Sequence, residues 1–210
     1  MNAPDLLARL VAGGQTDQDD PAREQILDAA ESLFLDFGIR RTTIGQIARR
    51  ANIGRPTLYK RFADKDVLVQ ALCMRDSRRL IRDVAKAVSA ISPPEEQLVQ
   101  AFIIAAQQVN QHPLLRRLLD TEPELILPYM TINAGPFVDI GHGLLAPILK
   151  SLQAKGHFQK LDIDYLLEAL ARLFVSIIST PTSRLNSDDP DGVELLARGV
   201  LRPLLGSSGE

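Results

Sequence analysis

The chain has 210 residues and is slightly acidic, with 24 Lys and Arg against 26 Asp and Glu, and 45% of its residues are hydrophobic. This length allows one large or two modest globular domains, and there is no uninterrupted apolar run long enough for a membrane span. Cys73 is the only cysteine, which excludes an internal disulfide or a multi-cysteine metal site. We interpret it as a small buried hydrophobe.

Residues 1–19 are expected to form a flexible N-terminal arm, with one short helical piece around residues 6–11. The arm ends in the polar run QTDQDD and contains Gly13-Gly14. It carries Asp5 and has no basic region before its short apolar stretch, so it lacks the features of a secretory signal. A cytoplasmic protein without a membrane partner is therefore expected.

The first helix is expected at Asp20-Pro21, because Asp is a preferred N-cap and Pro suits the first helical position. An apolar stripe follows, and Gly38 closes it, which predicts a helix over residues 21–37.

The next stretch, residues 42–62, reads TTIGQIARRANIGRPTLYKRF. Thr43 and Gln46 fit a capping box, which predicts a helix over residues 44–51. Pro56 is tolerable only if a new helix begins at about Gly54 or Arg55. Two short helices joined by a tight turn make a helix-turn-helix, with basic and aromatic residues facing outward from the second helix.

Basic residues gather in the same region. Between residues 37 and 63 the chain has no acid and these basic residues: Arg40, Arg41, Arg49, Arg50, Arg55, Lys60 and Arg61. Phosphate neutralisation dominates affinity for DNA, so an acid-free basic surface on an acidic chain favours double-stranded DNA as the partner over a merely solvated charged face. The following arginines, Arg75, Arg78, Arg79 and Arg82, are interspersed with acids and are interpreted as a solvated face.

Helical patterns continue to the C-terminus, and strand-like alternation is absent. After Asp64-Lys65-Asp66 a long helix is expected to about residue 90, followed by helices over 95–111, 113–120, 123–132, 137–155, 163–180 and 190–205, bounded mostly by Pro or Gly. The predicted fold is all-α. It consists of a three-helix helix-turn-helix domain over residues 20–66 and a larger C-terminal helical domain over residues 67–206.

The stretch TTIGQIARRANIGRPTLYKRFADKDVL resembles the DNA-binding segment of the TetR family of bacterial transcriptional regulators, and the resemblance covers about residues 20–70. It implies a homodimeric repressor that binds a palindromic operator and is released by a small apolar effector. The C-terminal domain would then serve effector binding and dimerisation.

The resemblance also implies roles for individual residues. Thr43 would cap its helix beside a phosphate, and Arg55 and Thr57 would lie where base edges are read. Tyr59, Lys60 and Lys65 would grip the DNA backbone. The full set of expected DNA contacts is Arg41, Thr42, Thr43, Arg55, Pro56, Thr57, Tyr59, Lys60 and Lys65. Gly54 and Pro56 stand where the family often has Ser and a small residue, so a stiffer start of the recognition helix is expected.

The segment YLLEALARLFVSII, residues 165–178, is apolar around more than one face and must be buried on several sides. A wholly internal core helix would explain this pattern, and so would a dimer interface. Dimerisation is favoured because two half-sites read by a symmetric dimer bind more tightly than one, and the family pairs its last two helices in this way. The candidate interface residues are Leu170, Phe174, Ile178, Val193, Leu196 and Val200.

The middle of the chain is rich in apolar residues with a few polar ones among them, as expected of a ligand cavity. The candidate pocket residues are Phe102, Leu115, Leu119, Tyr129, Met130, Phe137, His142 and Phe174. The histidines show no metal-ligand spacing, and no nucleophile, base and orienter occur together, so no metal, cofactor or enzymatic activity is expected. Two alternatives stay open: a DNA-binding dimer without an effector, and a helical small-molecule-binding protein.

Overall fold

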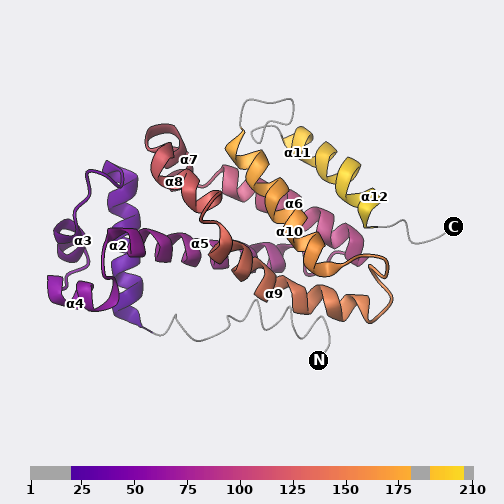
Figure 1. Ribbon diagram of the computed structural model, residues 1–210, viewed down its shortest axis with the longest axis horizontal. Helices are drawn as coiled ribbons and strands as arrows, with labels where there is room; N and C mark the ends of the chain where they lie inside the picture. Colours follow the sequence, from indigo (N-terminus) through magenta and orange to yellow (C-terminus); the bar gives the residue numbers. More distant parts are fainter. Residues whose placement is uncertain (1–19, 181–189, 206–210) are drawn as a thin grey trace. The chain divides into compact units, whose positions relative to one another are not determined.

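The computed structural model describes residues 20–180 and 190–205, and every regular element in these ranges is helical (Figure 1). The predicted all-α class is confirmed. The elements are α2 (Pro21–Phe37), α3 (Ile44–Arg50), α4 (Arg55–Arg61), α5 (Lys65–Ala87), α6 (Pro94–Asn110), α7 (Pro113–Thr121), α8 (Pro123–Met130), α9 (Gly135–Gln153), α10 (Ile163–Ser179), α11 (Pro190–Leu196), the π-helical turn η1 (Ala197–Leu201) and α12 (Arg202–Leu204).

The predicted helices agree with these bounds to within a few residues, while the predicted N-terminal arm and its helical piece lie outside the described residues. Across the described ranges, no helix combines the length and the apolar character needed to cross a membrane.

The helices form two compact units. The helix-turn-helix unit holds α2, α3, α4, the part of α5 up to Ser77, and α7 and α8. The C-terminal unit begins at Arg78 within α5 and holds α6, α9, α10 and the last helices.

The core of the helix-turn-helix unit collects side chains from all six of its helices. Phe34, Ile47, Leu58 and Phe62 are fully buried in it. Leu114 and Leu118 from α7 and Ile126 from α8 belong to the same core. This packing unit is therefore larger than the predicted domain of residues 20–66, because the side chains that complete its core come from much later in the sequence.

Cys73 packs against this core, and burial raises the pKa of its thiol to about 12. The thiol therefore stays protonated at neutral pH, as expected for a residue that serves as a small hydrophobe.

Local caps fix the first helices as predicted. The Asp20 side chain accepts a hydrogen bond from the Ala22 N–H at 3.0 Å, which caps α2. At α3 the capping box is complete, since the Thr43 hydroxyl accepts from the Gln46 N–H at 3.3 Å and the Gln46 side chain accepts from the Thr43 N–H at 2.8 Å.

The turn between α2 and α3 is held from inside the unit by Glu122, which is 8% exposed. Its Oε2 accepts from the Ile39 N–H at 2.6 Å and its Oε1 accepts from the Arg40 N–H at 3.0 Å. Gly38 lies against this carboxylate with a φ of +82°, and a Cβ there would come within 3.0 Å of both carboxylate oxygens. Glycine is needed at this position for the backbone conformation and for the close approach.

A buried arginine joins α5 to α2, contrary to the predicted solvated face. Arg75 is only 4% exposed, and its guanidinium lies 2.7 Å from Asp28, 2.6 Å from Glu31 and 3.2 Å from Asp76. The prediction for Arg75 was wrong because its main partners are on another helix, which the neighbouring sequence does not reveal. Burial raises the pKa of the Asp76 carboxyl, although Arg75 opposes this effect.

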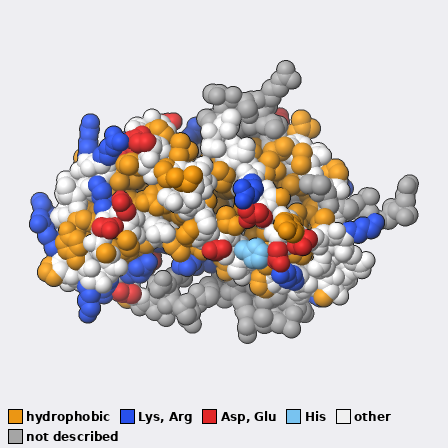
Figure 2. Space-filling model, in the orientation of Figure 1, with side chains coloured by type: hydrophobic (Ala, Val, Ile, Leu, Met, Phe, Trp, Pro, Cys, Tyr) orange, Lys and Arg blue, Asp and Glu red, His pale blue; other side chains and the backbone are white. Residues whose placement is uncertain are grey.

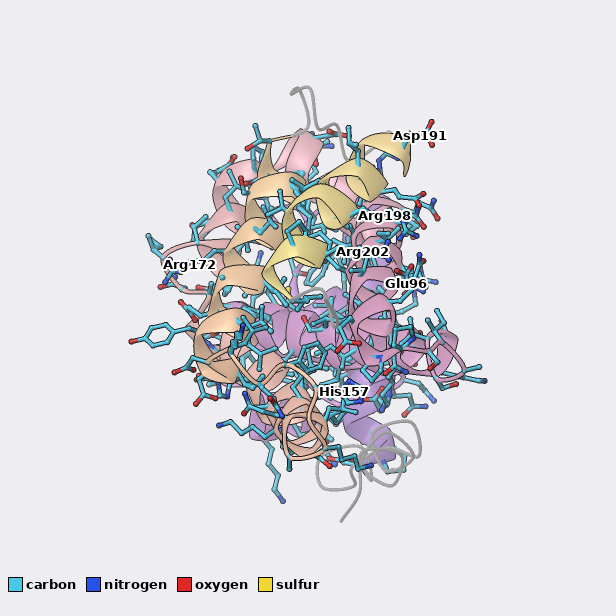
Figure 3. The ribbon with its side chains drawn as sticks, turned by 90° about the vertical axis from the view of Figure 1, so that its right-hand side faces the viewer. Glu96, His157, Arg172, Asp191, Arg198 and Arg202 are labelled. Atoms are coloured by element: carbon cyan, nitrogen blue, oxygen red, sulfur yellow. The ribbon has the colours of Figure 1, made fainter. Side chains whose placement is uncertain are left out.

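In the C-terminal unit α9 packs along α10, and the last helices pack against α6 (Figure 1). The Phe102 and Phe174 rings meet edge to face in the core, with centroids 6.1 Å apart. Arg198 and Glu96 of α6 lie at the surface of this unit (both labelled in Figure 3). The Arg198 guanidinium lies 3.0 Å from Glu96 and 2.7 Å from Glu194.

Replacement of Glu122 by Gln should destabilise the protein. The side-chain amide of Gln has one oxygen that can accept and one NH2 group that can only donate, so one of the two backbone N–H groups loses its acceptor. An unpaired buried N–H lowers the free energy of unfolding by about 1–3 kcal/mol. Chemical denaturation measures this loss. Glu124→Gln is the matched control, because the Glu124 ion pair with Arg40 is about half exposed on both sides and should contribute less than about 1 kcal/mol. Equal losses in the two variants would contradict the role assigned to Glu122.

Candidate nucleic-acid interface

The helices α3 and α4 pack against each other and bury one side of each in the shared core. Ile47 and Ala48 of α3 and Leu58 of α4 are buried. All the predicted DNA contacts on α4 are exposed, namely Arg55, Pro56, Thr57, Tyr59 and Lys60. The predicted outward orientation of the basic and aromatic side chains at these positions is therefore confirmed.

The start of α4 is built from backbone atoms alone. Gly54 is its N-cap and makes no side-chain capping bond, and the Gly54 carbonyl accepts from the Thr57 N–H at 3.0 Å and the Leu58 N–H at 3.2 Å. Pro56 lies in the first turn, where its missing N–H has no intrahelical partner to lose. Gly54 is exposed and has no side chain that could cover this end of the helix.

The basic residues of the acid-free stretch divide into two groups. Arg40, Arg50 and Arg61 pair with acids from outside the stretch, namely Glu124, Asp36 at 3.3 Å and Asp20 at 2.6 Å. The hydrogen bond from Arg61 also lowers the pKa of the Asp20 carboxyl.

The other group consists of Arg41, Arg49, Arg55 and Lys60, whose side chains make neither an ion pair nor a hydrogen bond within residues 20–180 and 190–205. All four are exposed, and Lys and Arg side chains mark the left-hand edge of the molecule over α3 and α4 (Figure 2). Of the seven basic residues in the stretch, these four are available to an anionic partner.

Two predicted DNA contacts have other roles here. The Thr42 side chain is 1% exposed, and its hydroxyl donates to the Gly38 carbonyl at 2.7 Å. Lys65 is partly buried and donates to the Ile39 carbonyl at 2.8 Å and the Thr42 carbonyl at 3.2 Å. Both side chains stabilise the turn that leads into α3, and the buried Thr42 hydroxyl is not available at the surface.

The candidate pocket residues are distributed over the two units. Leu115, Leu119 and Tyr129 pack against the core of the helix-turn-helix unit, as partly buried residues. Phe102 and Phe174 belong to the core region of the C-terminal unit. The others, Met130, Phe137 and His142, are half-buried, and the Nε2 atom of His142 lies 3.1 Å from an Asp164 oxygen. The effector pocket remains a prediction.

The candidate dimer residues are mostly covered within their own chain. Ile178 and Val193 are buried, and Leu170, Phe174 and Leu196 are partly buried against the C-terminal core, whereas Val200 is exposed. The large apolar side chains that α10 and α11 leave exposed are Tyr165, at 77%, and Leu195, at 70%.

Sequence reasoning missed Tyr165 and Leu195. On α10 the exposed residues Tyr165, Ala169, Arg172 and Ser176 recur every three or four positions, and this spacing was the available signal.

The structure also brings together Glu31, Asp76 and His112, whose potential ligand atoms lie within 4.8 Å of one another. Their distance in sequence hid this cluster. Arg75 already neutralises the two acids. The Nδ1 atom of His112 accepts from the Leu115 N–H at 3.3 Å as the cap of α7, so a neutral ring carries its proton on Nε2. With that nitrogen protonated, His112 is a poor metal ligand.

Comparisons with known proteins agree with this geometry. The family model "Bacterial regulatory proteins, tetR family" matches residues 26–72. An uncharacterised HTH-type transcriptional regulator of Mycobacterium tuberculosis is 31% identical over 156 residues, which is 74% of this chain and 79% of the relative. The chain belongs to the TetR family and is a helix-turn-helix transcriptional regulator.

Solved structures share the fold. The TetR-family repressor AlkX of Dietzia sp., implicated in the biodegradation of n-alkanes, superposes with a TM-score of 0.67 at 23% identity, over 91% of this chain and 97% of that one. RolR in complex with resorcinol gives a TM-score of 0.64 at 16% identity, over 89% and 88% of the two chains.

The two groups of basic residues should differ in how they affect DNA binding. The logarithm of affinity falls as the logarithm of salt concentration rises, and Lys60→Ala should make this fall less steep by about one unit of slope. The reason is that one phosphate contact and its released counterion are lost. Arg50→Ala should change the slope less, because the Arg50 guanidinium already faces Asp36. Fluorescence anisotropy over a salt series on one DNA duplex compares the two, and equal slope changes would contradict the division.

Proposed function

We propose that the protein is a homodimeric repressor that acts in the cytoplasm and places the two α4 helices of the dimer in adjacent major grooves of a palindromic operator. The observation that carries this proposal is a set of four exposed cations on α3, on α4 and in the turn before α3, which have no ion pair or hydrogen bond in the described part of the chain. Unpaired cations on a rigid helix pair supply both phosphate neutralisation and donors for base edges.

The roles within the interface follow from position and chemistry. Arg55 and Thr57 lie in the first turn of α4, the part of a recognition helix that reaches base edges. Lys60 and the exposed Tyr59 lie further along the same helix and suit the phosphate backbone. Arg41 lies just before α3 and would hold an adjacent phosphate. The Thr43 hydroxyl donates to Gln46 Oε1 at 2.8 Å and would contact a phosphate by exchanging that bond. Lys65 would act through the turn that it stabilises.

Two copies would associate through α10 and α11. Tyr165 of α10, Leu195 of α11 and Val200 of the following turn η1 are exposed apolar side chains, and a second copy would cover them. The buried members of the predicted interface, Ile178 and Val193, would support that surface from beneath. A symmetric contact of this kind presents two reading helices with a fixed spacing, as a palindrome requires.

An apolar small molecule is the proposed effector, bound among the apolar residues of the C-terminal helices. Support comes from RolR, whose structure holds resorcinol, and from AlkX, a repressor implicated in the biodegradation of n-alkanes. An effector that favours one of two dimer states by about 1–3 kcal/mol changes operator binding by roughly 5- to 150-fold. In this role the protein regulates transcription and catalyses no reaction.

Selection of bound DNA from a genomic or random library tests the central proposal. A palindrome with half-sites one helical turn or a multiple of it apart is expected. Recovery of a single unrepeated site would argue against the dimer, and recovery of no enriched sequence would contradict operator recognition. A thermal-shift screen of apolar compounds tests the effector, and a stabilising compound should also weaken binding to the selected site.

Leu195→Asp should weaken self-association by on the order of tenfold or more, because it places a charge at an apolar contact that excludes water. Sedimentation velocity over a concentration series measures the change, and circular dichroism checks that the helices remain. Ile132→Asp is the control, because Ile132 is also an exposed apolar residue but belongs to the helix-turn-helix unit. Self-association as tight as that of the unaltered protein would contradict the proposed dimer surface.

A further inference from the structure

One glycine of α3 lies under the Arg55 side chain. A Cβ on residue 45 would come within 2.5 Å of Nη2 of Arg55 and within 3.0 Å of its Cζ and Nε atoms. Non-bonded heavy atoms do not approach so closely, since carbon contacts are optimal near 3.5–4.0 Å. The guanidinium of Arg55 therefore occupies the space that any side chain at residue 45 would fill.

The position of this glycine is not explained by the backbone. Gly45 is the second residue of α3, its φ is not positive, and it is only partly buried. Glycine is among the least favourable residues within a helix, and alanine would suit the same backbone better. What alanine would change is the contact with Arg55.

Attraction within the protein does not explain the position of Arg55 either. Its guanidinium makes no ion pair or hydrogen bond in the described part of the chain. It lies against the first turn of α3, where the helix dipole is positive and repels a cation. The missing side chain at residue 45 leaves room for the guanidinium at this place.

We propose that Gly45 is a positioning residue for Arg55: the absence of a side chain at residue 45 lets the guanidinium lie against α3 at that residue, with its donors available to DNA. The proposal rests on the DNA-binding function proposed above, and it concerns the orientation of Arg55, one of the residues assigned to base recognition. A planar guanidinium that is restricted before binding loses less conformational freedom when it forms paired hydrogen bonds with a guanine edge or a phosphate.

A double-mutant cycle on the selected operator tests this proposal. The variants are Gly45→Ala, Arg55→Ala and both together, with affinity measured by anisotropy at fixed salt. Arg55→Ala should weaken binding by roughly 5- to 150-fold. Gly45→Ala should weaken it several-fold in the presence of Arg55 and have no further effect when Arg55 is absent. It should also alter base preference at the position that Arg55→Ala relaxes.

Thermal unfolding separates positioning from a structural role. The clash at residue 45 involves only the far end of a flexible side chain, so Gly45→Ala should leave Tm unchanged or raise it by about 2–4 °C. Gly143→Ala is the matched control, because Gly143 is also a helical glycine, on α9, and has open space around its Cβ position. It should affect stability in the same direction and leave operator affinity unchanged.

The outcomes distinguish the two levels of the proposal. If Arg55→Ala weakens binding while Gly45→Ala does not, or weakens it equally with and without Arg55, the positioning role is overturned and DNA binding stands. Stronger binding by Gly45→Ala would mean that Gly45 holds Arg55 away from DNA, which also overturns it. If Arg55→Ala has no effect on the selected operator, the assigned reading residue and the positioning role fail together.

Discussion

The carboxylate of Glu122 is the contact on which the geometry of the helix-turn-helix unit depends. It accepts from the Ile39 and Arg40 N–H groups and so fixes the turn that delivers the chain into α3. The Thr42 hydroxyl and the Lys65 ammonium satisfy carbonyls of the same turn. Because the α3 cap follows at Thr43, this small polar network determines where α3 begins, and α4 packs on α3.

The sequence predicted the helices well because their ends are fixed by local signals. Asp20-Pro21 starts α2 and the capping box of Thr43 and Gln46 starts α3, and both signals act within three residues. The contacts that assemble these helices depend on residues far apart in sequence. Glu122 is 83 positions from Ile39, and Arg75 is 44 positions from Glu31, so neither pairing was visible. The same reason explains why α7 and α8 were not assigned to the unit that holds the helix-turn-helix.

At the candidate interface, the sequence predicted the basic residue types. It did not predict which of these side chains are already paired with acids. The sequence shows seven basic residues and no acid between residues 37 and 63, but pairing with Glu124, Asp36 and Asp20 occupies three of them. These pairs connect the stretch to neighbouring segments and reduce its effective charge. The positive surface is therefore more concentrated than the sequence indicates. The basic residues of the stretch without a partner among the described residues lie on α3, on α4 and at the turn before α3. Such concentration makes the interface depend on few residues, and on the direction in which each of them points.

The position of Glu122 relates this interface to the proposed switch. Glu122 lies at the junction of α7 and α8, and its two hydrogen bonds end on the turn before α3. Loss of a buried hydrogen bond to a charged group costs about 1.5–3 kcal/mol, which is similar to the 1–3 kcal/mol that couples effector and operator in allosteric proteins. A ligand could displace the α7–α8 junction far enough to break one of these bonds and release the turn. The free-energy cost would be no larger than the difference in binding free energy that an effector typically shows between two protein states. Because α3 and α4 follow directly from that turn, the displacement would reach the reading helix. It would also shift part of the shared core, since Leu118 of α7 and Ile126 of α8 are buried there.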